Sequence, residues 1–299
     1  MHRERVIVVG AGPAGVAAAV QCLRLGIAPR ILDRSGDAGG LVENAFSVEN
    51  YPGIEKPLCG PELAGRLRAH LVRFGLEVDR AEVTAIVKEE DDFIVAGDMG
   101  MMRARAVILA SGTEPVRLGM SNARECEGRV VFYDVRSLLR RYPNPREVVV
   151  IGGGEAACDY ALSLSAAGAR VTMAVRSNRL KARGRLADAV RRSSAVRVAL
   201  ETVCESIGIS PPAVRLRGAA EGTEESKIDA VLVAVGRRST AAALLGSMGA
   251  AAPAAEDDLF PGLFVAGDAR HGALGQAGMA VGDGISAATA AVSFLEDGP

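Results

Sequence analysis

Aromatic residues and paired cysteines are the scarcest features of this sequence. Phenylalanine, tyrosine and tryptophan make up 4% of its 299 residues, and tryptophan does not occur at all. The five cysteines are scattered through the chain, at positions 22, 59, 126, 158 and 204. This distribution excludes a disulfide framework and is typical of a protein of the reducing cytoplasm.

The sequence also has almost no net charge and no long uninterrupted apolar run. The formal net charge of −1 gives no reason to expect nucleic acid or an anionic membrane as a partner. The longest stretch of small apolar residues, 241–255, is interrupted by Gly246, Gly249 and Pro253 and is too short to span a bilayer. A strand-like run begins at Val6, so we predict no signal peptide. We also predict no metal site.

Glycine and apolar residues are abundant instead. The chain contains 35 glycines, and hydrophobic residues make up 49% of it. This composition predicts a globular protein, and the length predicts two domains that can each bury a core. Small residues at this frequency suit tight turns between strands and helices.

The N-terminal segment predicts a dinucleotide-binding unit. A buried-type strand over 6–9 leads into Gly10-Ala-Gly-Pro-Ala-Gly15, and a helix over 16–25 and a strand over 29–32 follow. In such a turn the first glycine permits the tight bend, the second lets a pyrophosphate approach the backbone, and the third lets helix and strand pack closely. Asp33 ends the second strand, where it is placed to accept a hydrogen bond from a ribose 2′-OH. A turn of this kind can also serve packing alone.

The same strand–turn–helix unit recurs later in the chain. A strand over 148–151 leads into Gly152-Gly-Gly-Glu-Ala-Ala157, followed by a helix to about residue 167 and a strand over 171–175. No acid ends that second strand. Arg176 stands there instead, and behind it come Arg179, Lys181, Arg183 and Arg185. Arginine at this place can pair with the 2′-phosphate of NADPH, which a carboxylate would repel. We predict this role for Arg176, against the alternative of a solvated basic helix face, which we favour for Arg183 and Arg185.

The remaining segments predict how the two units are organised. A helix is predicted over 61–74, an antiparallel meander over 78–102 and a buried strand over 106–110. The strand-like segment Leu263-Phe-Val-Ala-Gly-Asp268 precedes a Gly/Ala-rich helix and is similar to the first unit. The predicted fold is therefore α/β, with two Rossmann-like, three-layer domains. The first domain is discontinuous, over 1–113 and 245–299, and the second, over 114–244, interrupts it, with hinges near 113–117 and 237–244.

An ordered set of motifs along the chain resembles the low-molecular-weight thioredoxin reductases, which are FAD-dependent pyridine nucleotide-disulfide oxidoreductases. The matching segments are the turn Gly10–Gly15, Gly39-Gly-Leu41, Val48-Glu-Asn-Tyr-Pro-Gly53, Ala110-Ser-Gly-Thr113, Ile151-Gly-Gly-Gly154, Ala234-Val-Gly236, Gly267-Asp268 and Gln276-Ala277. The resemblance implies an FAD-binding domain over 1–113 and 245–299, and an NAD(P)H-binding domain over 114–244. Arg176 and the missing acid predict NADPH, with NADH as the alternative, and the resemblance implies a homodimer.

The resemblance also implies roles for individual residues. Asn50 would lie beside the isoalloxazine, Asp268 would hold the ribityl chain, and Val83 would lie by the adenine. Gln276 and Ala277 would face the flavin pyrimidine edge, where negative charge develops on reduction. The predicted FAD-binding residues are Gly10, Gly12, Pro13, Ala14, Gly15, Asp33, Gly40, Leu41, Asn50, Val83, Ala110, Gly112, Gly267, Asp268, Gln276 and Ala277. The predicted NADPH-binding residues are Gly152, Gly154, Glu155, Ala156, Arg176, Lys181 and Gly236.

The chain departs from that group at the active dithiol. Thioredoxin reductases carry Cys-x-x-Cys just before the second glycine-rich turn, where this chain reads Phe132-Tyr-Asp-Val-Arg-Ser137. No two cysteines have that spacing, so a local route for thiol–disulfide exchange is missing, and we assign no catalytic residue. Gly275, where many relatives have arginine, is a second departure. The region between Gly236 and Leu263 looks shorter than usual, which predicts the loss of a hairpin.

The single cysteines and His271 each allow a structural and a catalytic interpretation. Cys22 and Cys158 are predicted to be packed as small hydrophobes, whereas Cys59 lies in a loop and stays open as a redox-active thiol. His271 follows Gly267-Asp268 closely. We interpret it as a structural or surface histidine, with a general-acid role as the alternative.

These observations predict an NAD(P)H-dependent flavin oxidoreductase. A hydride would pass from the nicotinamide to the flavin, and electrons would then reach a separate acceptor, a redox protein or a small molecule. The resemblance suggests ferredoxin or flavodoxin, because ferredoxin–NADP reductases of this group also lack the dithiol. Two alternatives remain: a disulfide reductase that uses an atypical cysteine, and a non-catalytic flavin-binding redox sensor or partner subunit.

Overall fold

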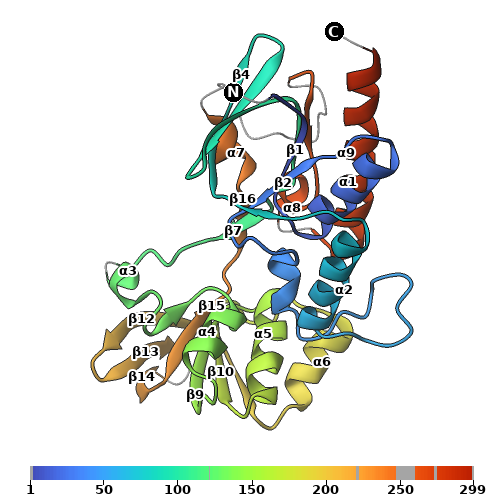
Figure 1. The fold of residues 1–299 in the computed structure, drawn as a ribbon. Coiled ribbons are helices and arrows are strands. Elements are labelled where there is room, and N and C mark those ends of the chain that lie inside the picture. The colour runs from blue at the N-terminus through green and yellow to red at the C-terminus, as the bar shows by residue number, and fades with distance from the viewer. Residues whose placement is uncertain (1–2, 121, 220–221, 247–259, 273–274, 298–299) are drawn as a thin grey trace. The chain divides into compact units, whose positions relative to one another are not determined.

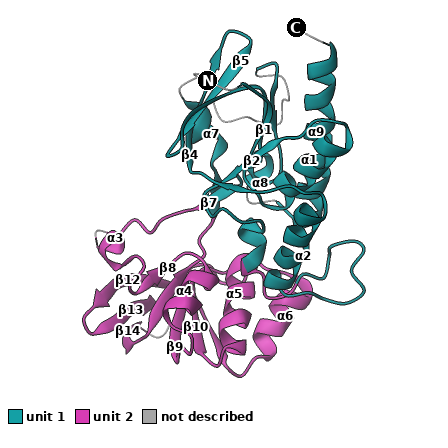
Figure 2. Cartoon of the chain, in the orientation of Figure 1, with its two compact units in different colours: residues 1–43, 48–114, 237–299 teal, residues 44–47, 115–236 magenta. Residues whose placement is uncertain are grey.

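The structure is a computed structural model of the chain and describes residues 3–120, 122–219, 222–246, 260–272 and 275–297 (Figure 1). Its internal contacts divide the chain into two units, which Figure 2 shows in different colours. Unit 1 comprises Met1–Glu43, Val48–Glu114 and Arg237–Pro299, and unit 2 comprises Asn44–Ser47 and Pro115–Gly236.

Unit 1 is built on a seven-stranded sheet. Its strand order is β3-β2-β1-β6-β5-β4, and β17 also pairs with β6. The strands β3, β2, β1, β6 and β17 pair in parallel, whereas β4, β5 and the first part of β6 form the antiparallel meander that the sequence predicts over 78–102. The strand that the sequence predicts separately over 106–110 is the second part of β6, which runs from Gly100 to Leu109 without a break. The bounds are β1 Arg3–Val9, β2 Arg30–Asp33, β3 Asp79–Arg80, β4 Val83–Glu89, β5 Asp92–Gly97, β6 Gly100–Leu109 and β17 Leu263–Val265.

The helices of unit 1 complete its core. They are α1 Pro13–Arg24, the 3₁₀ turn η1 Gly40–Asn44, α2 Gly60–Arg73, α7 Ala241–Leu245, α8 Asp268–His271 and α9 Ala277–Asp297. The helix α1 begins at Pro13 rather than at residue 16, because proline suits the first helical position and the extended Gly12 precedes it. A Cβ on Gly284 of α9 would lie 2.1 Å from the carbonyl oxygen of Ala14. The close packing of α9 on α1 therefore depends on glycine at position 284.

One described helix, α9, is long and apolar enough to cross a membrane by length and composition. The sequence analysis considered only the stretch 241–255 as a possible membrane span, and α9 lies outside that stretch. Several of its small residues are buried with those of α1 in one core cluster: Ala280, Ala287, Ala288, Ala291 and Val292. This packing buries one face of α9. A single helix of this length and composition is weak evidence for a membrane span, because core helices pass the same test.

Unit 2 holds a second parallel sheet. Its five strands have the order β11-β10-β9-β15-β8, with all pairs parallel, and a separate antiparallel sheet has the order β12-β13-β14. The strands are β8 Val131–Phe132, β9 Glu147–Ile151, β10 Arg170–Val175, β11 Val196–Leu200, β12 Thr202–Ile209, β13 Pro212–Gly218, β14 Gly222–Lys227 and β15 Ala230–Val233. The helices are α3 Ala123–Cys126, α4 Val135–Arg141, α5 Glu155–Ala166 and α6 Gly184–Arg192.

The second segment of unit 1 begins at Arg237 rather than at residue 245. Two observations explain this boundary. The short strand β16 (Arg237–Ser239) pairs with β7 (Thr113–Pro115), and α7 buries Ala241, Leu244 and Leu245 in the core beside the meander. The predicted loss of a hairpin falls on residues 247–259, which lie outside the described residues.

Candidate functional site

The first glycine-rich turn has the geometry that a bound pyrophosphate requires. A Cβ on Gly10, whose φ is +102°, would lie 2.3 Å from the carbonyl oxygen of Ala110, and a Cβ on Gly15 would lie 1.8 Å from that of Gly10. Neither position admits a side chain. Nothing lies within 4 Å of a Cβ built on Gly12, so the backbone there is open to a ligand at the N-terminus of α1, where helix N–H groups favour an anion.

Asp33 lies at the end of β2 and is held against this turn. Its Oδ2 accepts a hydrogen bond from the Ala11 amide at 2.9 Å, and its Oδ1 accepts from the amide and hydroxyl of Ser35 at 2.8 and 2.6 Å. A carboxylate has about four acceptor sites, so Asp33 can accept a further bond from a ribose hydroxyl. The Ala81 amide donates to the Asp33 carbonyl at 3.0 Å, which brings the chain just before Val83 to the same edge.

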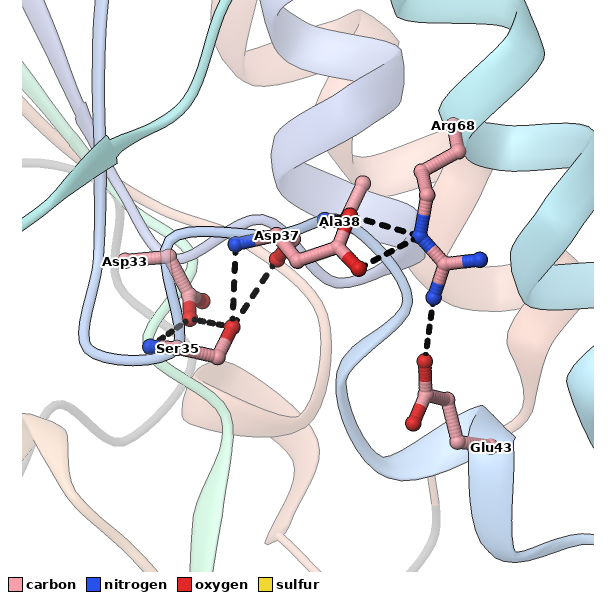
Figure 3. A network of polar contacts seen from close by, with 6 residues as sticks. All are labelled: Asp33, Ser35, Asp37, Ala38, Glu43 and Arg68. Atoms are coloured by element: carbon pink, nitrogen blue, oxygen red, sulfur yellow. Dashed lines mark hydrogen bonds and ion pairs between the residues drawn. The ribbon is translucent and has the colours of Figure 1, made fainter.

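A polar network that the sequence did not reveal fastens the loop after Asp33 (Figure 3). Arg68 of α2 donates from Nε to Asp37 at 2.6 Å and from its terminal nitrogen to Glu43 at 2.5 Å. The amide of Gly39 donates to the Ala11 carbonyl at 3.0 Å, and a Cβ on Gly40 would lie 3.0 Å from Cα of Gly12. Arg68 therefore ties together the two ends of a loop that packs directly on the first turn.

Two residues that the resemblance assigns to the flavin lie together although the chain separates them widely. The side-chain amide of Asn50 donates to Oε1 of Gln276 at 2.6 Å. Gln276 directly precedes α9, which begins at Ala277. The structure thus brings Asn50, Gln276 and Ala277 to one place in unit 1.

Asp268 begins α8 after the left-handed Gly267. The Gly267 amide donates to Oδ2 of Asp283 at 3.0 Å, and Nε2 of His271 lies 2.8 Å from the same oxygen. Burial raises the pKa of the Asp268 carboxyl above its usual range, with Asp283 adding to that effect and Arg237 and His271 opposing it. Asp283 is a further residue that the sequence did not reveal, because nothing in the pattern of α9 shows that its side chain reaches the turn at Gly267.

The second glycine-rich turn repeats the geometry of the first. A Cβ on Gly152, whose φ is +140°, would lie 2.3 Å from the Ala234 carbonyl oxygen, whereas nothing lies within 4 Å of a Cβ on Gly154. Gly154 precedes α5, and the exposed Glu155 and Ala156 open that helix. Gly154 thus leaves the backbone open at a helix N-terminus, as Gly12 does in unit 1.

The basic segment after β10 returns to this second turn. Arg176 follows the last residue of β10 and is exposed. The amide of Lys181, which is also exposed, donates to the Gly153 carbonyl at 2.7 Å. The chain from Arg176 to Lys181 is therefore anchored beside the turn. Gly236, with φ of +138°, accepts a hydrogen bond from the Val116 amide at 2.9 Å.

The segment that replaces the dithiol is occupied by structural contacts. Tyr133 is 8% exposed, and its hydroxyl accepts a hydrogen bond from the Leu118 amide at 3.2 Å. The guanidinium of Arg117 lies 4.7 Å from the centre of its ring. Asp134 caps α4 by accepting from the Ser137 amide at 2.7 Å. Neither side chain can take over the chemistry of a thiol pair.

All five cysteines lie within the described residues and are free thiols. Cys22, Cys126 and Cys158 are buried, and burial raises the pKa of Cys22 to about 12 and that of Cys158 to about 11. Burial also raises the pKa of Cys204 to about 11. Because the thiolate is the reactive form, these environments disfavour reactivity. Cys59 is exposed at the start of α2, where its amide donates to the Glu62 carboxylate at 2.9 Å.

Asp159 of α5 is a titratable residue that the sequence did not single out. Its Oδ2 accepts a hydrogen bond from the Phe46 amide at 2.8 Å, within the segment Asn44–Ser47 that belongs to unit 2. Burial raises the pKa of its carboxyl to about 6, against the lowering effect of the hydrogen bonds from the backbone of Phe46 and Ser47.

Among the described residues, no group of three or more His, Cys, Asp or Glu side chains could hold a metal ion.

Comparison with known proteins gives one family. The family model "pyridine nucleotide-disulphide oxidoreductase" matches residues 4–284. A thioredoxin reductase of Treponema pallidum is 33% identical over 97% of this chain and 97% of that protein. The solved thioredoxin reductase of Lactococcus lactis has a TM-score of 0.88 at 27% identity, over 98% of this chain and 99% of that one. The atypical thioredoxin reductase of Desulfovibrio vulgaris Hildenborough has a TM-score of 0.51 at 29% identity, over 98% of both chains.

Proposed function

Because the chain belongs to the pyridine nucleotide-disulphide oxidoreductase family, as a thioredoxin reductase-like oxidoreductase of FAD and NAD(P)H, we propose that it delivers electrons from NADPH to a separate acceptor without a dithiol of its own. When bound, NADPH supplies the hydride and FAD receives it. The observation that carries this proposal is the combination of two open glycine-rich turns with five unpaired thiols.

The contacts of unit 1 support it as the FAD-binding part. The open backbone at Gly12 would receive the pyrophosphate, and Asp33, held by Ala11 and Ser35, would bind the adenosine ribose. The pairing of Asn50 with Gln276 supports their common position beside the flavin ring. The remaining FAD-binding residues are proposed on the resemblance of their motifs.

The contacts of unit 2 support it as the NADPH-binding part. The open backbone at Gly154 and the positive end of α5 would receive the second pyrophosphate. Arg176 and Lys181 would bind the 2′-phosphate, because the chain between them is anchored on Gly153 and no acid ends β10. A carboxylate at that place would repel the phosphate and favour NADH instead.

We propose a redox protein as the acceptor, and ferredoxin or flavodoxin in particular. The proposal rests on the absence of a thiol pair that could relay electrons to a disulfide. A homodimer in the cytoplasm is proposed with it, by resemblance to the thioredoxin reductases and from the scattered free cysteines.

Two other functions have some support. Cys59 is the exposed thiol, so a disulfide reductase with a single atypical cysteine would use it. A non-catalytic flavin-binding sensor or partner subunit would not need to select a 2′-phosphate, and the cations at Arg176 and Lys181 argue against that function.

Anaerobic stopped-flow reduction of the bound flavin tests the proposal. The purified protein should be yellow with stoichiometric FAD, and NADPH should bleach the flavin absorbance faster than NADH at equal concentration. Ferredoxin or flavodoxin added to the reduced protein should restore the absorbance. A colourless protein that does not take up FAD, or a flavin that neither nucleotide reduces, would contradict the proposal.

A further inference from the structure

One arginine of α2 holds both ends of the loop that follows Asp33. Arg68 donates from Nε to the two carboxylate oxygens of Asp37, each at 2.6 Å, and from a terminal nitrogen to Oε1 of Glu43 at 2.5 Å (Figure 3). The planar guanidinium presents these donors in a fixed geometry, which lets one side chain bridge two carboxylates. Its backbone is fixed too, because α2 packs in the same core cluster as Ala38 of the loop.

The residues between the two carboxylates pack on the first glycine-rich turn. Gly39 and Gly40 have φ of +140° and +60°, a conformation that residues other than glycine rarely adopt. The Gly39 amide donates to the Ala11 carbonyl at 3.0 Å, and a Cβ on Gly40 would lie 3.0 Å from Cα of Gly12. Glycines lose more conformational freedom on ordering than other residues do, so this segment depends on attachments on either side of it. Arg68 provides one on each side.

The same arginine is connected to Asp33 by a chain of hydrogen bonds. The Ser35 hydroxyl donates to Oδ1 of Asp33 at 2.6 Å, and the Asp37 amide donates to Oγ of Ser35 at 3.2 Å (Figure 3). Arg68 binds the Asp37 side chain at the end of this chain. It therefore restrains both the carboxylate that would bind the ribose and the segment Gly39–Leu41 that the resemblance assigns to FAD.

We propose that Arg68 is a positioning residue for FAD, because it bridges Asp37 and Glu43. The bridge keeps Asp33 and the segment Gly39–Leu41 in the arrangement that binds the cofactor. This inference rests on the proposed FAD site of unit 1, and Arg68 needs no contact with FAD for the role. A partly exposed ion pair contributes little to stability by itself, but a side chain that preorganises a binding loop raises affinity by lowering the cost of ordering that loop.

A double-mutant cycle on FAD affinity tests the inference. The apoproteins of the wild type, Arg68→Ala, Glu43→Ala and the double variant are titrated with FAD, and the dissociation constants follow from flavin fluorescence. Arg68→Ala should weaken FAD binding by about three- to tenfold, the effect of charge-assisted hydrogen bonds at a partly exposed site. Glu43→Ala should weaken it by a smaller factor, because the pair with Asp37 remains. In the Arg68→Ala background Glu43→Ala should change the affinity by less than about twofold, because the bridge is already absent.

Two further variants separate the bridge from charge and from general effects on α2. Lysine keeps the charge but lacks the planar fork, so Arg68→Lys should recover only part of the affinity that Arg68→Ala loses. Arg73 is exposed on the same helix and lies outside the network of Figure 3, so Arg73→Ala should leave FAD affinity unchanged. Urea unfolding of the apoproteins measures their stability separately from FAD affinity.

Equal FAD affinity of Arg68→Ala and wild type would overturn the inference, whether or not the free energy of unfolding fell, because Arg68 would then have a structural role alone. An equal effect of Glu43→Ala in both backgrounds would overturn it too. Should Arg68→Ala fail to fold, weaker FAD binding by both Arg68→Lys and Glu43→Ala would support the inference, and unchanged affinity in either would overturn it. A wild-type chain that takes up no FAD would instead overturn the proposed function itself.

Discussion

At the scale of the residue, we predict that cofactor preference depends on the cations after β10. Arg176→Ala should weaken NADPH binding by about ten- to a hundredfold and leave NADH binding nearly unchanged, because a hydrogen bond to a charged phosphate contributes roughly 1.5–3 kcal/mol. Equilibrium titration of the flavoprotein with each nucleotide measures both affinities.

Arg183→Ala is the control for this prediction. Arg183 is also exposed but stands outside the segment anchored on Gly153, and its loss should affect neither nucleotide. An equal loss of NADPH and NADH affinity in Arg176→Ala would mean that Arg176 stabilises unit 2 and does not select the phosphate.

Asp159 predicts a pH dependence of stability. Its folded pKa of about 6 lies above the ordinary value of 3.8, so the folded state binds a proton that the unfolded state releases. Its contribution to stability therefore rises as pH falls from about 7 to about 4, by about 1–3 kcal/mol. Asp159→Asn cannot titrate and should lack this component. Urea unfolding of both proteins between pH 4 and 8 measures it.

The wild type is the comparison for that experiment, since Asp159→Asn differs from it only in the carboxyl that contacts Phe46. If the stabilities of Asp159→Asn and wild type differed by the same amount at every pH, the buried carboxyl would not be the group that titrates.

At the scale of the element, the packing of α9 on α1 predicts that alanine substitution has opposite effects on stability at two glycines of α9. Gly284→Ala should lower the stability of the chain by about 1–3 kcal/mol, because the new Cβ would overlap the Ala14 carbonyl. Gly282→Ala should raise it by up to about 1 kcal/mol, because alanine is the better helix former and the site is open. Thermal and urea unfolding measure both changes. Equal shifts in the two variants would show that α1 and α9 do not approach each other as closely as described.

At the scale of the whole molecule, the unpaired thiols predict flavin chemistry that needs no cysteine. Cys59→Ser should leave the rate of flavin reduction by NADPH unchanged, because the hydride route uses no thiol. Neither the wild type nor this variant should reduce thioredoxin at a rate comparable to a reductase with a dithiol. Thioredoxin reduction by the wild type that disappeared in Cys59→Ser would instead establish a single-cysteine disulfide reductase.

Much of the fold could be predicted because its units are local. A strand, a glycine-rich turn and a helix are adjacent in the chain, and each has its own periodicity, so β1 with α1 and β9 with α5 were predicted to within a few residues. The antiparallel meander was predicted for the same reason, but the strand predicted separately over 106–110 proved to be the second part of β6. The boundary at Arg237 was not, since it depends on the pairing of β16 with β7 and on the burial of α7.

The sequence by itself determined the two dinucleotide-binding turns, their glycines, the cations after the second turn and the absence of a dithiol. Each of these is a property of residue types at short spacing. The tertiary structure decided that Arg68 fastens the loop at Asp37 and Glu43, that Asp159 binds the amide of Phe46, and that Asp283 binds the amide of Gly267. The residues in each of these contacts are not related by the regular spacing of a helix or a strand. The sequence pattern therefore does not reveal the contacts, and only the folded backbone brings the side chains together.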